Sequence, residues 1–347
     1  MIHFIYVILE TDAYFYSCYY DLVDQLYQTY DSDSTFSTFQ EQVRFSIFWD
    51  SDQSKHSLIH SFSSNGIIRS KLERSLDIST KVSGFVNQCC QSSSKDELLV
   101  FCFYVHGNIW FLRHCKKIIT LQSIMDKIQY RLDVMCLESC YSASLENCRV
   151  ISRVADILVT SEHTHARCGV ISSEWIDWMN QRLEQKTSPL TSVECGAVLA
   201  KSFLHRVNSF SFRDVDTLSL VSDISVIDLR SFSRLYSLSL QLHINRQPLD
   251  VYKRSKIEPK RSKHKLGYDL WSVVLSSPVL SETLKSQFAK VYATVVLFYG
   301  QSKWMQEKPR ASRSHGLCWC PAPYDSDYGW MYKLISAFED RERLTIY

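Results

Sequence analysis

Hydrophobic residues gather in short uninterrupted runs through the first half of the chain, and stretches with helical spacing lie between them. The apolar runs cover residues 2–9, 43–49, 99–105, 132–137 and 155–160. Short runs of this kind are typical of strands buried on both faces of a parallel sheet. Apolar positions recur at steps of three and four over residues 13–29, 80–91, 118–129 and 142–154. The alternation predicts an α/β fold with helices on both faces of a mostly parallel sheet.

The second half has a different pattern. Helical spacing covers residues 172–185, 189–206, 223–243 and 268–299, and the chain from His315 onward predicts a strand, a loop and a short helix. The polar, serine-rich segments 50–64 and 92–95 are interpreted as surface loops. We therefore expect an α/β core over residues 1–171 and a mostly helical C-terminal subdomain over 172–347, with a closing strand near 315–320.

A histidine and a cysteine follow two of the apolar runs. His106 and Gly107 come directly after 99–105, and Cys140 comes shortly after 132–137. Because the segment between these runs has helical spacing, the two strands should be joined by a crossover and lie parallel. Both side chains would then emerge at the carboxyl edge of the sheet, where open α/β folds build their sites.

This pairing has a definite chemical use. A free thiol has a pKa of about 8.5, and a neighbouring imidazole lets it attack as a thiolate and then supplies the proton for a leaving amine. The pattern predicts Cys140 as nucleophile and His106 as general base and acid. The alternative is structural, since most of the twelve cysteines must be small buried hydrophobic residues.

Composition excludes some classes of partner. The 347 residues are 45% hydrophobic and 22% charged, as in an ordinary globular protein. A net charge of +2 gives no electrostatic case for nucleic acid or a membrane surface, and no run approaches the roughly 20 apolar residues of a membrane span. The basic run at 253–265 is interpreted as a solvated loop, with a targeting or nucleic-acid patch as the alternative. We expect a monomer.

Cysteine usage bears on the compartment. The cysteines form no CxxC pairs, and several fall within predicted buried strands. Free thiols fit a reducing cell, so we expect a cytoplasmic protein, with secretion as the alternative. The apolar start at residues 1–9 lacks the basic segment and small-residue cleavage site of a signal peptide.

The residues around Cys140 and His106 resemble those of the clostripain-like cysteine peptidases of the caspase-like clan. Segment 137–146 reads Leu-Glu-Ser-Cys-Tyr-Ser-Ala-Ser-Leu-Glu where the family reads apolar-Asp-Ala-Cys-Leu-Met-x-x-x-Glu, and His106 with Gly107 is similar to its His-Gly. Further likenesses follow in chain order, at 5–9 with Asp12, 44–50, 155–162 with Gly169, 268–271 and 315–321. The resemblance implies a caspase-like α/β/α sandwich and a cysteine endopeptidase that cleaves protein or peptide substrates after Arg or Lys.

Glu138 and Gly107 are the predicted supporting residues. A carboxylate two residues before the nucleophile can line the substrate pocket and select Arg or Lys, as the family's acid at this position does; alternatively, Glu138 is paired internally or caps the next helix. The N–H groups of Gly107 and Cys140 could hold the oxyanion, although Gly107 could equally form a simple turn. Relatives commonly cut themselves between histidine and nucleophile, which makes the bonds after Lys116 and Lys117 candidates for autoprocessing.

No cofactor or metal is expected from the residues themselves. His163, His165 and Cys168 form a weak metal pattern without a fourth ligand, and a polar loop accounts for them. Some relatives depend on calcium, so the resemblance leaves a calcium requirement open. The sequence does not show which residues would bind the ion.

Departures from the family pattern leave alternatives to an Arg- or Lys-specific peptidase open. Glu138 replaces an Asp, Cys168 replaces the usual acid before Gly169, and the Gly-rich loop after His106 is replaced by residues 108–113. The chain also has only nine glycines. A catalytically inactive homologue that binds peptides or regulates an active relative is therefore the second hypothesis, and an active peptidase with another side-chain preference is the third.

Overall fold

Five parallel strands form the centre of the molecule, at the positions that the apolar runs predict. In the computed structural model these are β1 (Ile2–Glu10), β2 (Val43–Ser51), β5 (Leu98–Gly107), β8 (Leu132–Glu138) and β9 (Ala155–Thr160). Their order across the sheet is β9-β8-β5-β1-β2, and each neighbouring pair is parallel. The structure describes residues 1–10, 16–31, 37–51, 56–72, 77–107, 112–114, 117–163, 168–185, 188–210, 222–241, 256–257, 267–306 and 314–319.

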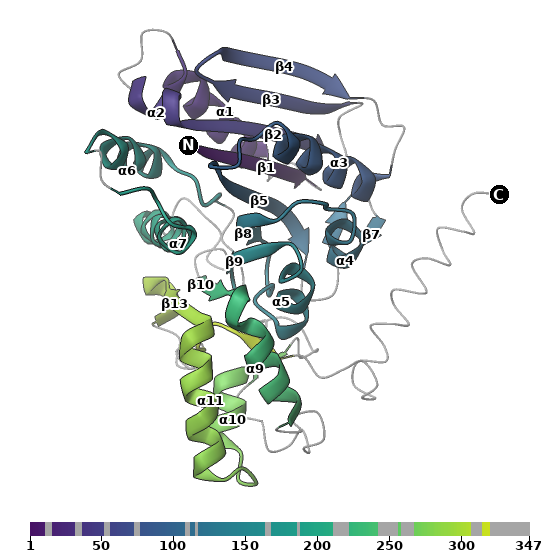
Figure 1. Cartoon of the computed structure of the whole chain (residues 1–347), viewed down its shortest axis with the longest axis vertical. Coiled ribbons are helices and arrows are strands. Elements are labelled where there is room, and N and C mark those ends of the chain that lie inside the picture. The colour runs from purple at the N-terminus through teal and green to yellow at the C-terminus, as the bar shows by residue number, and fades with distance from the viewer. Residues whose placement is uncertain are drawn as a thin grey trace, which may run out of the picture.

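Antiparallel strands extend this sheet at both ends (Figure 1). The hairpin of β3 (Ser57–Ser63) and β4 (Gly66–Leu72) pairs with β2 at one end. At the other end β10 (Asp223–Asp228) pairs with β9, and β13 (Val296–Gln301) pairs with β10. Two strands from the second half of the chain thus complete the sheet of the first half, and the division at residue 171 stays a prediction.

Two short assemblies of strands lie beside the main sheet. β6 (Leu112–His114) pairs antiparallel with the end of β5, and β7 (Lys117–Ile119) pairs with β6. A separate three-stranded sheet contains β11 (Lys256–Ile257), β12 (Gly267–Asp269) and β14 (Cys318–Trp319). β14 lies within the segment 315–320 in which a strand was expected. Apart from β11, the basic run at 253–265 lies outside the described residues.

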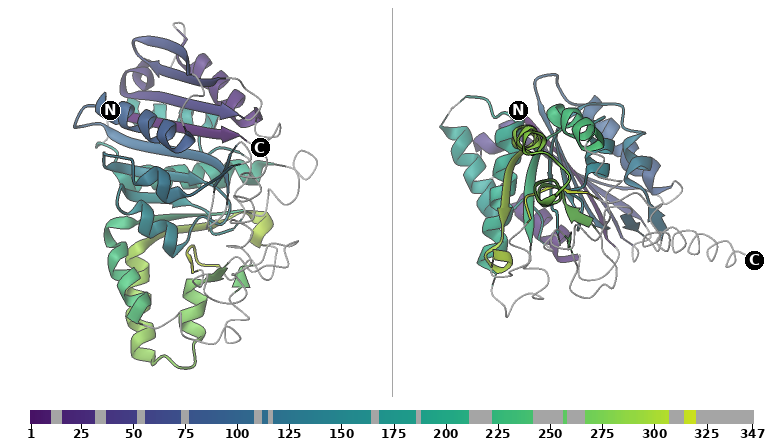
Figure 2. Two further views of the ribbon diagram at one scale, coloured as in Figure 1. Left: turned by 90° about the vertical axis from the view of Figure 1, so that its right-hand side faces the viewer. Right: turned by 90° about the horizontal axis from the view of Figure 1, so that it is seen from below.

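Helices cover both faces of the sheet, as both views of Figure 2 show. One face carries α1 (Tyr16–Thr29), α2 (Ser37–Gln42), α6 (Ser173–Glu184) and α7 (Ser192–Ser209). The other carries α3 (Ile78–Gln91), α4 (Leu121–Met125), α5 (Leu145–Ile151) and α9 (Leu229–Gln241). Two further helices, α10 (Leu270–Ser276) and α11 (Glu282–Val295), join α9 at the lower end of the view in Figure 1, and α12 (Lys303–Gln306) follows β13.

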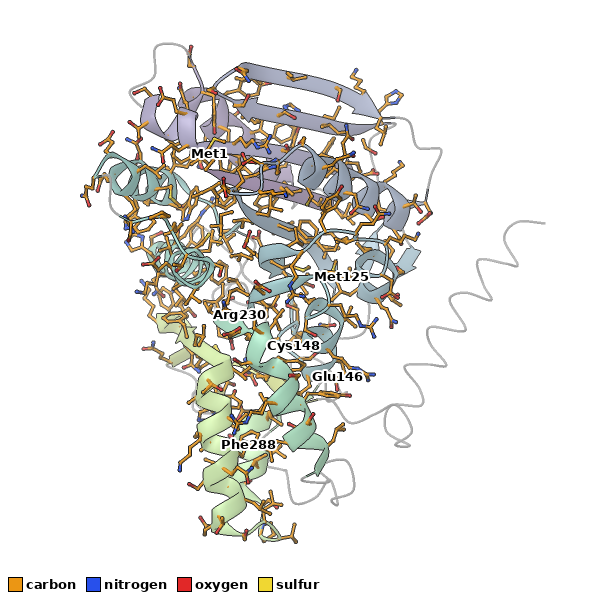
Figure 3. All side chains as sticks on the ribbon, viewed as in Figure 1. Met1, Met125, Glu146, Cys148, Arg230 and Phe288 are labelled. Atoms are coloured by element: carbon orange, nitrogen blue, oxygen red, sulfur yellow. The ribbon has the colours of Figure 1, made fainter. Side chains whose placement is uncertain are left out.

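The sheet separates two hydrophobic cores. Met125, Cys148 and Phe288, labelled in Figure 3, belong to the core on the α3 and α5 side. Trp175 of α6 lies on the other side and packs edge-on against Phe4 of β1 at 4.9 Å between ring centroids. Because both faces are covered, the central strands are mostly apolar, and the arrangement confirms the predicted α/β class.

Short polar side chains begin many of the helices. Each accepts a hydrogen bond from a backbone N–H in the first turn, which satisfies a donor that the helix leaves open. These N-caps are Asp77, Thr120, Ser144, Ser172, Thr191, Asp269 and Ser281. Thr191 forms a full capping box with Glu194.

Four predicted segments were wrong in type over all or part of their length. The polar loop at 50–64 contains β3, whose residues alternate between buried and partly exposed positions and so form a half-buried strand. The helix predicted over 223–243 is the fully buried strand β10 followed by α9, and 118–129 holds β7 before the short α4. The helix predicted over 268–299 is divided into β12, α10, α11 and β13. In the described part of the chain, no helix has both the length and the apolar character needed to cross a bilayer.

Candidate active site

The strands that precede His106 and Cys140 are direct neighbours. β5 and β8 are parallel, and Tyr104 is paired with Glu138 at the end of the ladder. Continuing this register by two residues brings the chain at His106 level with the chain at Cys140, and neighbouring strands lie about 4.8 Å apart. His106 and Gly107 are the last residues of β5, while the His106 side chain lies outside what the structure describes. The topology therefore brings both predicted dyad positions to one edge of the sheet.

Cys140 is the one partly exposed thiol among the nine free cysteines of the described residues. The others are buried, and burial raises the pKa of several, including Cys102, Cys148 and Cys195. A buried thiol resists ionisation because its thiolate loses its solvation. Its partial exposure at the carboxyl edge of the sheet thus distinguishes Cys140 from the buried, structural cysteines.

The residue after Cys140 has a strained backbone. Tyr141 has a φ of 55°, in the left-handed region, and it is the one non-glycine residue with positive φ among the described residues. A non-glycine residue in this conformation costs about 1–3 kcal/mol and persists only where surrounding contacts impose it. Strain of this kind often occurs at functional sites, and here it turns the chain sharply between β8 and α5.

Backbone hydrogen bonds impose this turn. Three successive N–H groups, of Tyr141, Ser142 and Ala143, donate to carbonyl oxygens of residues 161–163 at 2.7–2.9 Å. The N–H of Cys318 in β14 donates to the Ala143 carbonyl at 2.8 Å. The segment 161–163 and the closing strand therefore both hold the loop that carries Cys140.

Buried side chains hold the same loop from within. The Ser142 hydroxyl donates to the Ser139 carbonyl at 2.6 Å and lies 2.6 Å from the Thr160 hydroxyl, which donates to the Leu137 carbonyl. The Asn147 amide of α5 donates to the Ser142 carbonyl at 3.0 Å. These bonds connect the end of β8, the end of β9 and the start of α5.

Glu138 is buried beneath the loop, with 2% of its surface exposed. Its carboxylate accepts hydrogen bonds from the Tyr6 hydroxyl of β1 and, at 2.9 Å, from the Val170 N–H. Burial, and after it the Glu138 carboxylate, raises the pKa of Tyr6 well above its usual value, so the hydroxyl stays protonated and remains a donor. Gly169 lies against this pair, and a Cβ there would come within 2.9 Å of the Tyr6 oxygen. An internal partner for Glu138 is thus present, and its role in substrate choice stays a prediction.

The candidate autoprocessing segment is partly described. Lys117 begins β7 and is paired with His114 of β6, so it lies in a short antiparallel ladder. Lys116 lies outside the described residues, as do residues 108–111. The ladder covers three residue pairs at most, so local opening could still expose the bonds.

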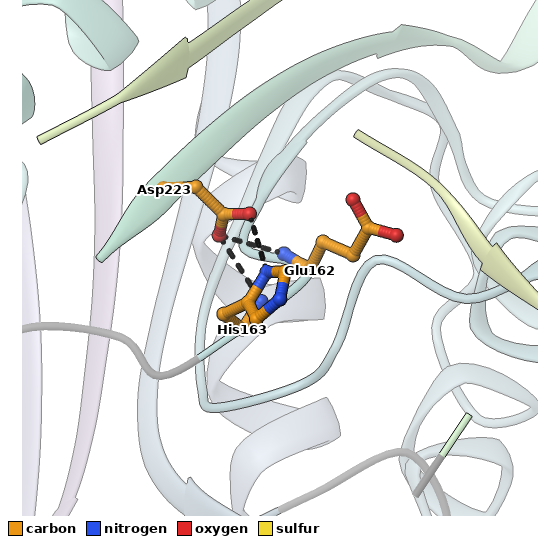
Figure 4. A group of neighbouring side chains, drawn as sticks. All are labelled: Glu162, His163 and Asp223. Atoms are coloured by element: carbon orange, nitrogen blue, oxygen red, sulfur yellow. Dashed lines mark hydrogen bonds and ion pairs between the residues drawn. The ribbon is translucent and has the colours of Figure 1, made fainter. Parts of the chain in front are cut away.

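Among the described residues, Glu162, His163 and Asp223 form the one group that could hold a metal ion, with ligand atoms within 4.8 Å of one another. The His163 Nδ1 lies 2.9 Å from Asp223 Oδ2, and Figure 4 shows the Glu162 carboxylate extending away from this pair. Hydrogen bonds account for these contacts. The weak metal pattern in the sequence had joined His163 to His165, which is outside the described residues, and to the buried Cys168.

A cluster of carboxylates that the sequence did not reveal connects the closing segment to β9. Glu162 accepts the Gly316 N–H at 2.8 Å, and Asp269 accepts both the backbone N–H and the ring nitrogen of His315 at 2.8 and 2.9 Å. Burial, with Asp269 and Asp223 nearby, raises the pKa of Glu162 well above its usual value. The segment 268–271 and the described residues 315–319 of the closing segment thus lie next to each other, behind the loop that carries Cys140 (residues 139–144, the nucleophile loop).

A cavity of about 630 Å³ lies at the opposite edge of the sheet. Its lining includes the starts of β1 and β5, with Glu97, Asp133 and Arg182 among the polar groups. Since β5 and β8 run from this edge towards His106 and Cys140, the cavity lies a strand length away from the dyad. We therefore place the active site by its residues and not by this cavity.

Solved structures with the same fold are cysteine proteases. The chain superposes on an inactive zymogen C11 protease from Parabacteroides distasonis with a TM-score of 0.68 and 12% identity over 97% of both chains. A secreted C11 cysteine protease from Bacteroides thetaiotaomicron in complex with an irreversible peptide inhibitor gives 0.66 and 10% over 96% of this chain and 97% of that one. A further structure of a secreted C11 protease from that organism, iotapain, gives 0.63 and 12% over 87% and 88%. No protein-family model and no curated protein matches the sequence.

These likenesses confirm the caspase-like α/β/α architecture and the resemblance to clostripain-like peptidases at the level of the fold. They contradict the expected cytoplasmic location, because both structures from Bacteroides thetaiotaomicron are of a protease described as secreted. Free cysteines do not require a reducing compartment in this fold. Eight of the nine described thiols are buried, so the fold itself shields them and no reducing compartment is needed to keep them free.

Proposed function

We propose that this chain is a cysteine endopeptidase of the clostripain-like kind, with Cys140 as nucleophile and His106 as its acid and base. The observation that carries the proposal is the parallel register of β5 and β8, which brings the two positions to the same edge. The partial exposure of Cys140 and the strained turn at Tyr141 support it, as does a fold shared with C11 proteases. One of those proteases was captured with an irreversible peptide inhibitor, and by analogy we propose peptide substrates here.

The proposed reaction is a two-step acyl transfer. His106 takes the proton of the Cys140 thiol, and the sulfur forms a bond to the carbonyl carbon of the scissile peptide. The N–H groups of Gly107 and Cys140 stabilise the oxyanion, and His106 returns the proton to the leaving amine as the C–N bond breaks. Water, deprotonated by His106, then hydrolyses the thioester and regenerates the thiol. The chemistry needs no metal or cofactor.

We propose that Glu138 gives the enzyme its preference for Arg or Lys. In the free chain its carboxylate is engaged by Tyr6 and Val170, so a substrate cation would reach it by replacing the Tyr6 hydroxyl as donor. A guanidinium or ammonium forms a stronger, charge-assisted bond to a carboxylate than a phenol does, which favours the exchange.

Labelling by a peptidyl-arginine chloromethyl ketone tests the proposed function. We expect the reagent to alkylate Cys140, located by peptide mapping, and the matched norleucine reagent to react much more slowly. Reaction of both reagents at equal rates would support a peptidase with another preference. Absence of label at Cys140, in a protein whose fold is intact by circular dichroism, would instead support the inactive, peptide-binding homologue.

Replacing Glu138 with glutamine should reduce the preference for Arg over Gln substrates roughly ten- to 150-fold, the value of a charge-assisted bond of about 1.5–3 kcal/mol. The substitution is isosteric, so thiol reactivity toward iodoacetamide should change little. The measurement is the ratio of kcat/KM for matched Arg and Gln peptides.

Tyr6→Phe is the companion variant. It removes the competing donor but keeps the carboxylate, so the preference should be retained or increased. An unchanged ratio in Glu138→Gln would assign selection to another acid.

We also propose that the protein processes itself after Lys116 or Lys117, which is consistent with the zymogen state of one protease of the same fold. Freshly made protein should convert over hours to two associated fragments, with a new N-terminus at Lys117 or Ile118, because the short ladder of β6 and β7 opens locally. Intact-mass spectrometry follows the conversion. Cys140→Ala and the double variant Lys116→Gln/Lys117→Gln should stay intact. A wild-type mass that never divides, in a preparation that cleaves added Arg substrate, would show activity without processing.

A further inference from the structure

The segment 161–163 is the main support of the nucleophile loop. The His163 carbonyl accepts the Tyr141 N–H at 2.7 Å, and the Ser161 carbonyl accepts the next two N–H groups of the loop. Tyr141 is bonded covalently to Cys140 and has the left-handed φ of 55°. The position of the His163 carbonyl therefore sets where the chain turns and where the Cys140 sulfur lies.

Asp223, at the start of β10, holds this segment in turn (Figure 4). Its Oδ1 accepts the N–H groups of Glu162 and His163 at 3.0 and 3.1 Å. Its Oδ2 accepts the His163 ring at 2.9 Å and the Tyr299 hydroxyl at 3.1 Å. The Asp223 side chain is fully buried, and its backbone carbonyl accepts the Ser161 hydroxyl at 2.7 Å.

We propose that Asp223 is a positioning residue for the nucleophile, acting on Cys140 through the backbone of residues 161–163. This inference rests on the proposed function, since it gives Asp223 a part in the chemistry of Cys140. One oxygen of Asp223 fixes two consecutive backbone N–H groups, and the carbonyl of the second of these residues fixes the N–H that follows Cys140. The other oxygen bonds to Nδ1 of the His163 ring and, with the Ser314 hydroxyl 3.2 Å from Nε2, orients the ring. No other described side chain accepts these two N–H groups.

The arrangement predicts which chemical property of Asp223 matters. Asparagine keeps a carbonyl oxygen that can accept both N–H groups, and its amide can bond to a His163 tautomer that offers Nδ1 as acceptor. Alanine keeps neither, and it removes the acceptor of both backbone N–H groups, of the His163 ring and of the Tyr299 hydroxyl. The role therefore requires an acceptor at this place and not a negative charge.

Asp223→Ala should lower kcat about ten- to a hundredfold on an Arg peptide, because small displacements of a reacting atom have effects of this size. KM should stay within about threefold, since substrate contacts are untouched. The rate of Cys140 alkylation by iodoacetamide should fall with kcat, and Asp223→Asn should restore both to within about threefold of wild type.

Asp228→Ala is the matched control, because it removes a carboxylate from the other end of the same strand. Asp228 bonds locally to the backbone and side chain of Arg230 and not to the segment 161–163. All variants are assayed well below their melting temperatures. Equal kcat losses in Asp223→Ala and Asp228→Ala, a wild-type kcat in Asp223→Ala, or an Asn variant as slow as the Ala variant would each overturn the proposal.

A milder variant covers the case in which Asp223→Ala does not fold. Asp223→Ser keeps a hydroxyl oxygen at this place, but the shorter side chain cannot accept both the Glu162 and the His163 N–H as the carboxylate does. It should lower kcat and Cys140 alkylation together by about three- to tenfold, and wild-type values for both would contradict the proposal.

The alkylation readout separates this inference from the proposed function. Iodoacetamide needs only a reactive thiol, and peptide mapping distinguishes Cys140 from the buried cysteines. If wild-type protein cleaves no peptide but Asp223→Ala still slows alkylation of Cys140, the positioning role stands and the peptidase proposal fails. If peptides are cleaved and alkylation is equal in both proteins, the positioning role fails alone.

Discussion

Replacing Cys140 with alanine should abolish peptide hydrolysis while leaving the fold intact. The thiolate forms the covalent bond of the proposed reaction, and loss of a nucleophile of this kind lowers kcat by about 10⁴-fold or more. The side chain is partly exposed at the end of β8, so the substitution removes one sulfur without opening a core cavity. The measurement is kcat/KM on an Arg peptide, with the melting temperature recorded on the same samples.

Cys90→Ala provides the matched control for this experiment. Cys90 lies on α3, where burial raises the pKa of its thiol to about 12, so it cannot serve as a nucleophile near neutral pH. Its removal should leave the rate unchanged at a modest loss of stability. Equal activity of Cys140→Ala and wild type would exclude the dyad, whatever the cause of the hydrolysis.

The central strands could be predicted because a strand that is buried on both faces forms a short, nearly continuous apolar run in the sequence. The runs at 99–105 and 132–137 are apolar at nearly every position, and β5 and β8 contain them. The placement of Cys140 and His106 followed from the crossover between those strands, since parallel strands end at the same edge. Local pattern and general topology were sufficient for this much of the site.

The errors occur where one pattern fits two structures. β10 is a run of buried residues that leads directly into α9, and the combined spacing over 223–243 fits a single helix. In β3, serines occupy several of the partly exposed positions, so a half-buried strand has the composition of a loop. Pairing with β2 and β4 decides this case, and that contact is tertiary.

The supports of the site could not be predicted because they join residues far apart in the chain. Tyr6 reaches Glu138 across 132 positions, and Asp223 reaches His163 across 60. Neither pair has a local motif, and both depend on which strands become neighbours. Asp223 in particular lies in a segment predicted as helix, where its side chain would have had no defined partner.

Replacing His106 with alanine should lower kcat about 10²–10⁴-fold, the usual contribution of a general acid and base. Without the imidazole, nothing accepts the proton of the Cys140 thiol, and the leaving amine receives no proton. The remaining activity should therefore keep rising as the pH becomes alkaline, whereas the wild-type rate should already be near its maximum at neutral pH. Alkylation of Cys140 by iodoacetamide, measured against pH, gives the same comparison without a substrate.

His114→Ala is the control, because it removes another imidazole from the segment that follows β5. A His106→Ala variant within tenfold of wild type would assign the base to a different residue. A described histidine that contacts the nucleophile loop is His163, whose ring bonds to Asp223 and whose carbonyl holds the turn after Cys140. In that outcome, His163→Ala should show the full loss of kcat, and its pH profile should shift as expected when the general base is removed. If His106 is the base, His163→Ala should lower kcat without moving the pH profile, because the ring then only positions the nucleophile loop.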